Sequence, residues 1–420
     1  MPVDERRHGP RPPRRIPEDR SEGFGERLLG QLLDRSHELP PQLIAPLVAE
    51  EVARIGGRDV SIHFQDYALI TLVPLPGRGL KVGDPVALDG SPEGYAFLGR
   101  RMVEESQADG VRVYVPLVDG ADEVGVLSLT LEALEEDDRR LLRRLAALIA
   151  EMVISKTRYT DQFFMARRRD RPLSLAAEIQ YAHLPPLAMH TPQVSLAAAL
   201  EPAYEVAGDS LDYALNDGIL HLAIIDAMGH GLEAALLATL ALGAHRRGRR
   251  MDVGLMELYE LMDQSIDGTF GLEQFVTAQM MRLNVSTGYL QWVNAGHPEP
   301  LLIRGHRVIE RLETADRLPM GFGLPAPQIA TAQLLPGDRV LFFTDGVIEE
   351  RGPAGQEFHE SRLIEAIQYV GPSSKGVIQT VRRLAATLER VRGGVSSDDA
   401  TLFLIEWHGG TADHLAELDT

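Results

Sequence analysis

The sequence predicts an α/β (α+β) fold in which antiparallel sheets are covered by helices. Strand-like runs are joined by tight polar turns, as in Leu211–Leu215 and Ile219–Ile225, which flank Asn216-Asp217-Gly218. Helical patterns come in pairs between such hairpins, which favours antiparallel sheets over a parallel βαβ sheet. A chain of 420 residues exceeds what one core usually supports, so we expect two globular domains.

The N-terminal part is predicted to be a tail followed by a small α/β domain. Residues 1–20 mix proline and arginine without apolar periodicity, which is typical of disorder. In residues 24–154, a helical pattern over Leu28–Ile55 is interrupted around Pro40 and Pro41. Strand-like runs then follow at Ala68–Val73, Val111–Leu117 and Val124–Leu129.

A helical linker is predicted over residues 134–185. Apolar residues spaced by seven, four, three and four positions form an a/d seam: Leu134, Leu141, Leu145, Leu148 and Met152. Two interpretations stay open, a short coiled coil that makes a homodimer, or a helix facing the core of the preceding domain. A second helical piece, Ser174–Tyr181, ends before Pro185.

Between residue 194 and residue 407, strands dominate. A second hairpin is expected from Phe275–Val285 and Tyr289–Val293. Helical patterns lie at Leu232–Arg246, Leu255–Ile266, Glu360–Tyr369 and Lys375–Arg390.

The composition narrows the possible partners and chemistries. The formal net charge is -19, and such a field repels phosphate backbones, so no nucleic-acid partner is expected. The chain has no cysteine, which excludes disulfides, thiolate metal sites and cysteine nucleophiles. It contains no secretory signal pattern and no run of about 18–20 apolar residues. We therefore expect no membrane association and a cytoplasmic location.

Four aspartates at the ends of predicted strands form the candidate metal site. They are Asp209, Asp226, Asp345 and Asp398; three of them adjoin a glycine or another acid, and Asp226 lies three residues before Gly229. Such carboxylates are the oxygen ligands that Mg²⁺ and Mn²⁺ prefer, and the neighbouring glycines permit close backbone approach. Two ions about 3.5–4 Å apart can supply both a hydroxide-like nucleophile and charge neutralisation for phosphate monoester hydrolysis. The carbonyl of Ala227 can add a ligand.

Residues 178–407 resemble the SpoIIE-type (RsbU-like) branch of the PPM metal-dependent Ser/Thr protein phosphatases. The matching stretches run in the family's order, with Glu178-Ile179-Gln180 at the start. They continue with residues 202–209 (PAYEVAGD), 226–231 (DAMGHG), 275–278 (FVTA), 294–298 (NAGHP), 318–321 (LPMG), 336–338 (PGD), 344–346 (TDG) and 398–401 (DDAT).

The resemblance implies an αββα sandwich over residues 186–408, followed by a tail over residues 409–420. It implies a centre of two Mn²⁺ or Mg²⁺ ions, with Asp209, Asp226 and the Ala227 carbonyl on the ions. Asp345 and Asp398 would complete the shell of the second ion. The implied substrate is a phosphorylated STAS-domain anti-sigma-factor antagonist, which places the enzyme in a bacterial partner-switching pathway.

The N-terminal domain resembles a GAF domain in two places. One is the loop-to-helix stretch at residues 89–97 (DGSPEGYAF), and the other is the pairing of residues 115–117 (VPL) with residues 123–129 (EVGVLSL). This resemblance implies a sensor that regulates the phosphatase in response to a small-molecule or protein signal.

Three further residues are candidates for a role at the metal site, and each also has a simple structural interpretation. His230 can hydrogen-bond a metal-bound water or a phosphate oxygen, or it can be a helix-start histidine facing solvent. Asp212 and Asp399 are interpreted as groups that orient the metal ligands, with local structural roles equally open.

Other functions compete with catalysis. A catalytically silent pseudophosphatase that only holds phosphoproteins is the alternative, and the presence of all four acidic positions argues against it. A two-metal nuclease is disfavoured by the negative charge and the missing basic stripe.

Overall fold

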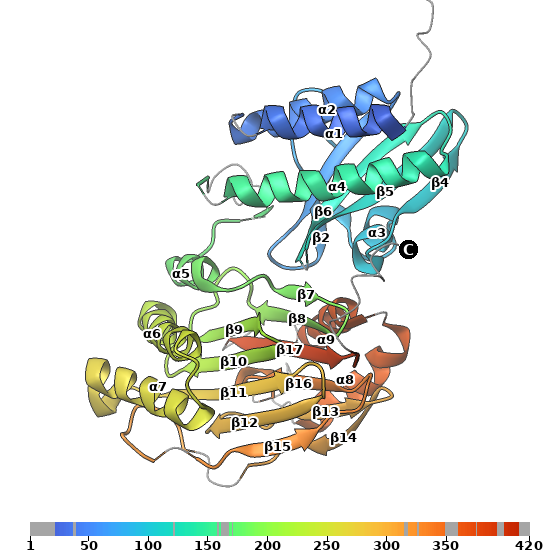
Figure 1. The fold of residues 1–420 in the computed structure, drawn as a ribbon. Coiled ribbons are helices and arrows are strands. Elements are labelled where there is room, and N and C mark those ends of the chain that lie inside the picture. Colours follow the sequence, from blue (N-terminus) through green and yellow to red (C-terminus); the bar gives the residue numbers. More distant parts are fainter. Residues whose placement is uncertain are drawn as a thin grey trace, which may run out of the picture.

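The computed structural model describes residues 22–36, 39–120, 122–157, 159–160, 168–169, 171–314, 318–325, 327–348, 360–374, 376–392 and 399–410. Figure 1 shows an N-terminal sheet with its helices above a larger C-terminal part built from two sheets. The predicted tails, residues 1–20 and most of 409–420, lie outside the described residues.

The N-terminal sheet has the strand order β3-β2-β1-β6-β5-β4. Its strands are β1 (Arg58–Gln65), β2 (Thr71–Pro74), β3 (Val86–Ala87), β4 (Val103–Gln107), β5 (Gly110–Asp119) and β6 (Asp122–Leu131). Three helices pack on one face, α1 (Glu22–Ser36), α2 (Ile44–Arg54) and α4 (Glu136–Thr157). The short α3 (Pro92–Gly99) packs on the other, where Phe97 is buried. The predicted small α/β architecture is therefore observed here.

Local side-chain bonds explain two boundaries in this sheet. The predicted loop-to-helix stretch does open α3, because the Ser91 hydroxyl accepts a hydrogen bond from Gly94 N at 3.0 Å and caps the helix. The strand predicted from Ala68 begins only at Thr71, because the Asp66 carboxylate accepts bonds from the backbone of Ile70 and Thr71 and holds a turn there.

The leucine seam of α4 faces the N-terminal core. Leu141, Leu145 and Met152 are at most 8% exposed and pack among the residues of β1, β5 and β6. Leu134 and Leu148 are partly buried against the same core. The apolar stripe is therefore buried inside the chain's own domain, which favours the core-facing interpretation over the coiled coil.

The C-terminal part is the αββα sandwich expected from the resemblance. One sheet has the order β15-β12-β11-β10-β9 and the other β14-β13-β16-β17-β8-β7. The strands of the first are β9 (Asp209–Asn216), β10 (Ile219–Ala227), β11 (Val276–Asn284), β12 (Tyr289–Ala295) and β15 (Ala330–Gln333). Those of the second are β7 (Ala188–His190), β8 (Val194–Glu201), β13 (Leu301–Arg304), β14 (Arg307–Arg311), β16 (Arg339–Phe343) and β17 (Ala400–Trp407).

Three apolar layers hold the sandwich together. Leu211, Leu222 and Ile224 from the first sheet meet Phe342 and Phe403 from the second between the sheets. The outer face of the first sheet is covered by α6 (Gly231–Arg250) and α7 (Leu255–Phe270). The outer face of the second is covered by α8 (Glu360–Val370) and α9 (Gly376–Arg392). Alternate residues of β9 and β10 therefore face two different layers.

The two parts of the chain meet around α5 (Leu175–His183), which Ser174 caps by accepting a bond from Ala177 N. The rings of Tyr67, after β1, and Tyr181, on α5, lie 4.7 Å apart, edge to face. On the other side of the junction, the Arg382 guanidinium of α9 donates to the Leu69 carbonyl. The N-terminal domain is thus in direct contact with two helices of the sandwich.

Among the residues described, no helix combines the length and the apolar character needed to cross a bilayer.

Candidate metal centre

Asp209 and Asp226 lie opposite each other at one end of the β9–β10 hairpin. Asp209 is the first residue of β9, Asp226 is the last but one of β10, and the antiparallel register pairs them directly. Directly opposite residues have Cβ atoms about 4.5–5.5 Å apart. Asp209 is 1% exposed, whereas Asp226 is half-buried. The Asp209 carboxylate is therefore the inner one of the pair, and Asp226 lies nearer to solvent, at the edge of the sandwich that we call the rim.

Two threonines of the opposite sheet hold the Asp209 carboxylate. The hydroxyls of Thr344 and Thr401 donate to Asp209 Oδ2 at 2.7 and 2.6 Å. Thr344 Oγ1 in turn accepts a bond from the Thr401 backbone N–H at 2.8 Å. Because these residues stand at the end of β16 and the start of β17, they fix the first sheet against the second at the site.

Asp345 and Asp399 reach the same rim from the second sheet. Asp345 follows Thr344 directly and opens a short 3-10 turn, and its side chain is half-exposed. A Cβ on Gly346 would lie 1.9 Å from the Asp399 carbonyl oxygen, so only glycine lets these two loops approach. Asp399 Oδ2 accepts bonds from Ala207 N and Gly208 N, both at 2.7 Å.

Hydrogen bonds from two other segments hold the loop before Asp209. Gln180 of α5, fully buried, donates to the Ala207 carbonyl, while Asp399 binds the two N–H groups. A Cβ on Gly208 would lie 2.8 Å from the Ala227 carbonyl oxygen. The Ala227 carbonyl oxygen therefore lies close to the residue that precedes Asp209.

The charge at this rim favours a cation. Burial first, and then repulsion from Asp226 and Asp399, raises the pKa of the Asp209 carboxyl well above its ordinary range. Carboxylate and carbonyl oxygens without nitrogen or sulfur are the donor set of Mg²⁺ and Mn²⁺. Asp398 lies outside the described residues, and among those described no group of three or more histidine, aspartate or glutamate side chains is arranged to hold a metal ion. The donor types present, carboxylates and a carbonyl, are those that a hard divalent ion prefers.

For Asp212, the contacts favour the local structural role, which is one of the two interpretations that the sequence left open. It lies on the face of β9 opposite to Asp209 and points toward α6, not toward the metal ligands. Its carboxylate accepts bonds from His245 at 3.1 Å, from Arg246 at 2.9 Å and from Arg249. Burial alone would raise the pKa of Asp212, but these partners together lower it to about 2. Asp212 is the anchor of the C-terminal end of α6.

His230 is the exposed N-cap residue of α6, and its side chain makes no capping hydrogen bond. It lies four residues after Asp226, on the rim side of the helix. This placement is the solvent-facing alternative and leaves the imidazole accessible to a substrate.

Sequence reasoning missed Thr344, Thr401 and Gln180. All three stand inside motifs that the sequence analysis recognised, at residues 178–180, 344–346 and 398–401, but their hydrogen-bonding roles were not predicted. Which way the hydroxyls point depends on how the two sheets pack.

The comparisons with known proteins concern the C-terminal part of the chain. Residues 216–408 match the family model described as Stage II sporulation protein E (SpoIIE). The matched range contains Asp226, Asp345 and Asp398, and Asp209 lies just ahead of it. The predicted resemblance to the SpoIIE-type branch of the PPM phosphatases is therefore confirmed for this part of the chain.

Two curated relatives share part of the chain. Protein IcfG of Synechocystis sp. is 22% identical over 261 residues, which are 56% of this chain and 41% of that protein. Phosphoserine phosphatase RsbP of Bacillus subtilis is 25% identical over 195 residues, which are 45% of this chain and 47% of that protein. The chain thus spans less than half the length of each of these relatives.

Solved structures with a similar fold include the SiaA-PP2C domain of Pseudomonas aeruginosa and the RsbU and RsbW domains of Rv1364c from Mycobacterium tuberculosis. The first is 19% identical, with a TM-score of 0.47, and covers 55% of this chain and 94% of its own. The second is 27% identical, with a TM-score of 0.44, and covers 52% of this chain and 63% of its own. At these TM-scores the likeness carries no argument about function.

Proposed function

We propose that this chain is a metal-dependent phosphatase that removes phosphate from phosphoserine or phosphothreonine in a protein substrate. The observation that carries the proposal is the direct cross-strand pairing of Asp209 with Asp226, beside Asp345, in a chain whose residues 216–408 match the SpoIIE family model. A relative named as a phosphoserine phosphatase supports the same chemistry.

The residues have separate tasks in this proposal. Asp209, Asp226, the Ala227 carbonyl, Asp345 and Asp398 would hold two Mn²⁺ or Mg²⁺ ions. When bound, such ions supply a deprotonated water and charge neutralisation for the phosphoryl group.

The surrounding residues keep this site in shape. Thr344 and Thr401 orient the Asp209 carboxylate, and Asp399 holds the loop that carries it. His230, exposed at the start of α6, is placed to hydrogen-bond a phosphate oxygen or a water.

The substrate is proposed to be a phosphorylated STAS-type antagonist of an anti-sigma factor in the cytoplasm. The half-exposed carboxylates at an open rim suit a phosphorylated side chain carried by a folded protein. The relative named phosphoserine phosphatase RsbP supports phosphoserine as the group hydrolysed, and the STAS-type carrier rests on the family resemblance alone.

Regulation by the N-terminal domain is part of the proposal. The contacts of Tyr67 with Tyr181, and of Leu69 with Arg382, join that domain to α5 and α9. Since α5 also holds the Ala207 carbonyl through Gln180, a signal in a GAF-like domain has a short physical route to the metal site. A homodimer stays a prediction, and its surface would have to exclude the buried seam of α4.

The test measures Mn²⁺-dependent release of phosphate from a phosphoserine-containing STAS protein and from p-nitrophenyl phosphate. The Asp226→Asn variant should be inactive on both, and Asp84→Asn, an exposed aspartate of the N-terminal domain, is the matched control. If the intact chain binds the phosphoprotein but takes up no metal and releases no phosphate, the pseudophosphatase alternative replaces this proposal.

A further inference from the structure

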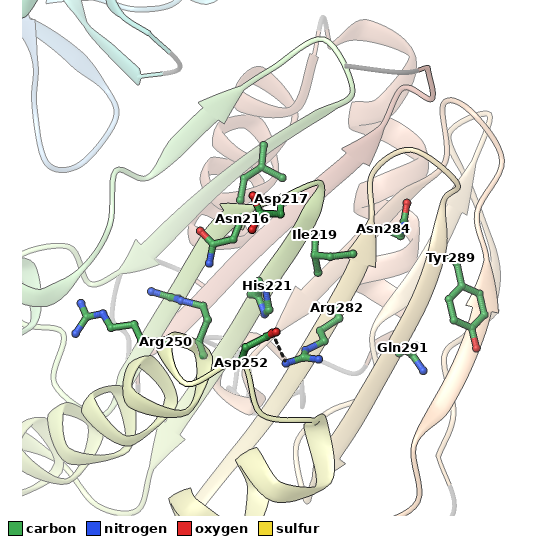
Figure 2. Close-up of a pocket in the computed structure, with 12 residues that line it drawn as sticks. Asn216, Asp217, Ile219, His221, Arg250, Asp252, Arg282, Asn284, Tyr289 and Gln291 are labelled. Atoms are coloured by element: carbon green, nitrogen blue, oxygen red, sulfur yellow. Dashed lines mark ion pairs between the residues drawn. The ribbon is translucent and has the colours of Figure 1, made fainter. Parts of the chain in front are cut away.

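A cavity of about 740 Å³ opens on the outer face of the first sheet, away from the metal site. It lies where α6 and α7 leave the far ends of β9–β12 uncovered, and Figure 2 shows the residues that line it. His221 in this cavity is five residues from Asp226 along β10, about 16 Å at the rise of a strand, and faces the opposite side of the sheet. The cavity is therefore separate from the metal centre.

The floor of the cavity is a row of polar side chains on three adjacent strands. The register pairs His221 of β10 with Arg282 of β11, and Arg282 with Gln291 of β12. Cross-strand partners on one face lie side by side, and Figure 2 shows His221 and Arg282 directed into the same space. Asn284 and Tyr289 lie one row further toward the strand ends.

Three guanidinium groups border this floor. Arg249 and Arg250 come from the last turn of α6, and Arg282 rises from β11. Arg282 donates through one terminal nitrogen to the Val253 carbonyl and lies 4.0 Å from Asp252, which is 92% exposed. Its Nε atom is buried and meets no hydrogen-bond acceptor among the described residues.

Two of these arginines lower the pKa of the buried His221. Its imidazole is 6% exposed, and burial, followed by the charges of Arg282 and Arg249, lowers the pKa of His221 to about 4. The Asp212 carboxylate neutralises part of the charge of Arg249, but it also pairs with Arg246. The lining also holds two carboxylates, those of Asp217 and Asp252, so three guanidinium groups face two acidic side chains in the cavity.

Helix capping does not account for the whole arrangement. Arginines in the last turn of a helix interact favourably with its dipole, which explains Arg249 and Arg250 on their own. It does not explain why β11 places a partly buried Arg282 beside His221 on the floor of a cavity, with a buried Nε–H that meets no acceptor among the described residues.

We propose that this cavity is a second ligand site, for a small organic phosphate of mononucleotide size. Guanidinium groups match phosphate oxygens through paired N–H donors, so Arg282 and Arg250 would hold the phosphate. The amides of Asn284 and Gln291 and the half-exposed ring of Tyr289 would contact the organic part. The volume lies within the range of small-molecule sites.

The test titrates adenosine 5′-monophosphate, and separately inorganic phosphate, into the full-length Asp226→Asn chain with EDTA, by calorimetry. This background removes metal-dependent phosphate binding at the catalytic rim, so the outcome is independent of the proposed phosphatase activity. We expect saturable binding of the nucleotide. Arg282→Gln should weaken it about tenfold or more, since it loses a charge-assisted hydrogen bond.

Three companion variants sharpen the result. Arg250→Gln, at an exposed position, should weaken binding of both ligands without loss of folding. Tyr289→Ala should weaken the nucleotide but not inorganic phosphate. Arg307→Gln, an exposed arginine of β14, is the matched control and should change neither. The proposal is overturned if neither ligand binds at millimolar concentration, or if Arg250→Gln and folded Arg282→Gln both keep the parent affinity.

Discussion

Asp209 and Asp212 lie on the same strand and are both 1% exposed, yet the pKa of Asp209 is raised whereas that of Asp212 is lowered to about 2. The difference comes from the faces of β9. Asp209 points between the sheets toward Asp226 and Asp399, whereas Asp212 points toward the cations of α6. Equal burial therefore has opposite effects on the pKa. Asp209 lies beside other carboxylates and would be stabilised in its charged form by a bound cation, whereas Asp212 is already paired with arginines of α6.

The largest expected difference between substitutions of Asp209 and Asp212 is in catalytic turnover. Asp209→Asn should lower Mn²⁺-dependent turnover by about 10³-fold or more, equivalent to roughly 4 kcal/mol, because it removes a metal-ligand charge. Steady-state kinetics on p-nitrophenyl phosphate measure this loss. Metal-free Asp209→Asn should be no less stable than the parent, since the substitution relieves repulsion from Asp226. A marked loss of stability in the metal-free variant would contradict the comparison.

Asp212→Asn should act in the opposite way. It leaves Arg246 and Arg249 without their buried counter-charge, so we expect a loss of about 3 kcal/mol in the free energy of unfolding. Urea denaturation monitored by circular dichroism measures this change. Asp217→Asn, in the exposed turn after β9, should change stability by about 0.5 kcal/mol or less. Equal stabilities of Asp212→Asn and the parent would break the assignment of Asp212 as the anchor of α6.

The pH dependence of stability sharpens the same point. The folded pKa of Asp212, about 2, lies below its unfolded value, so its contribution is complete above roughly pH 5 and is lost as the pH falls toward 2. The shift corresponds to roughly 2 kcal/mol. Urea unfolding between pH 5 and pH 2.5 should show a smaller decrease for Asp212→Asn than for the parent. Parallel pH profiles would show that Asp212 is not ionised against its partners in the folded chain.

The smallest effect concerns the hydroxyls that orient Asp209. Thr401→Val keeps the shape of the side chain but removes the 2.6 Å hydrogen bond, and should cost about 1 kcal/mol of stability. The affinity for Mn²⁺ should fall about tenfold, because groups that orient a ligand tune the metal. Calorimetric titration with Mn²⁺ checks this, and Thr239→Val, on the helix α6, is the control. Unchanged metal affinity would mean that Asp209 is held well enough by Thr344 alone.

Much of the sandwich was predictable because its periodicities are local. The hairpin of β9 and β10 and the helices α5 to α9 all appear close to where the residues predict them. The sequence left a choice open where one pattern fits two structures. The seam from Leu134 to Met152 fits a coiled coil and a core-facing helix equally, and only the apolar sheet beside α4 decides between them.

The sequence by itself determined the identity of the acidic residues, the absence of cysteine chemistry and the family resemblance, since these depend on residue types and their order. It also located Asp209 and Asp226 at strand ends. The tertiary structure alone decided which carboxylates share a face, because the register of β9 against β10 and the packing of the two sheets bring together residues up to 192 positions apart, such as Asp209 and Thr401. Because side chains alternate along a strand, Asp209 and Asp212 point to opposite faces of β9. Only the packing of the layers puts other carboxylates beside Asp209 and the arginines of α6 beside Asp212.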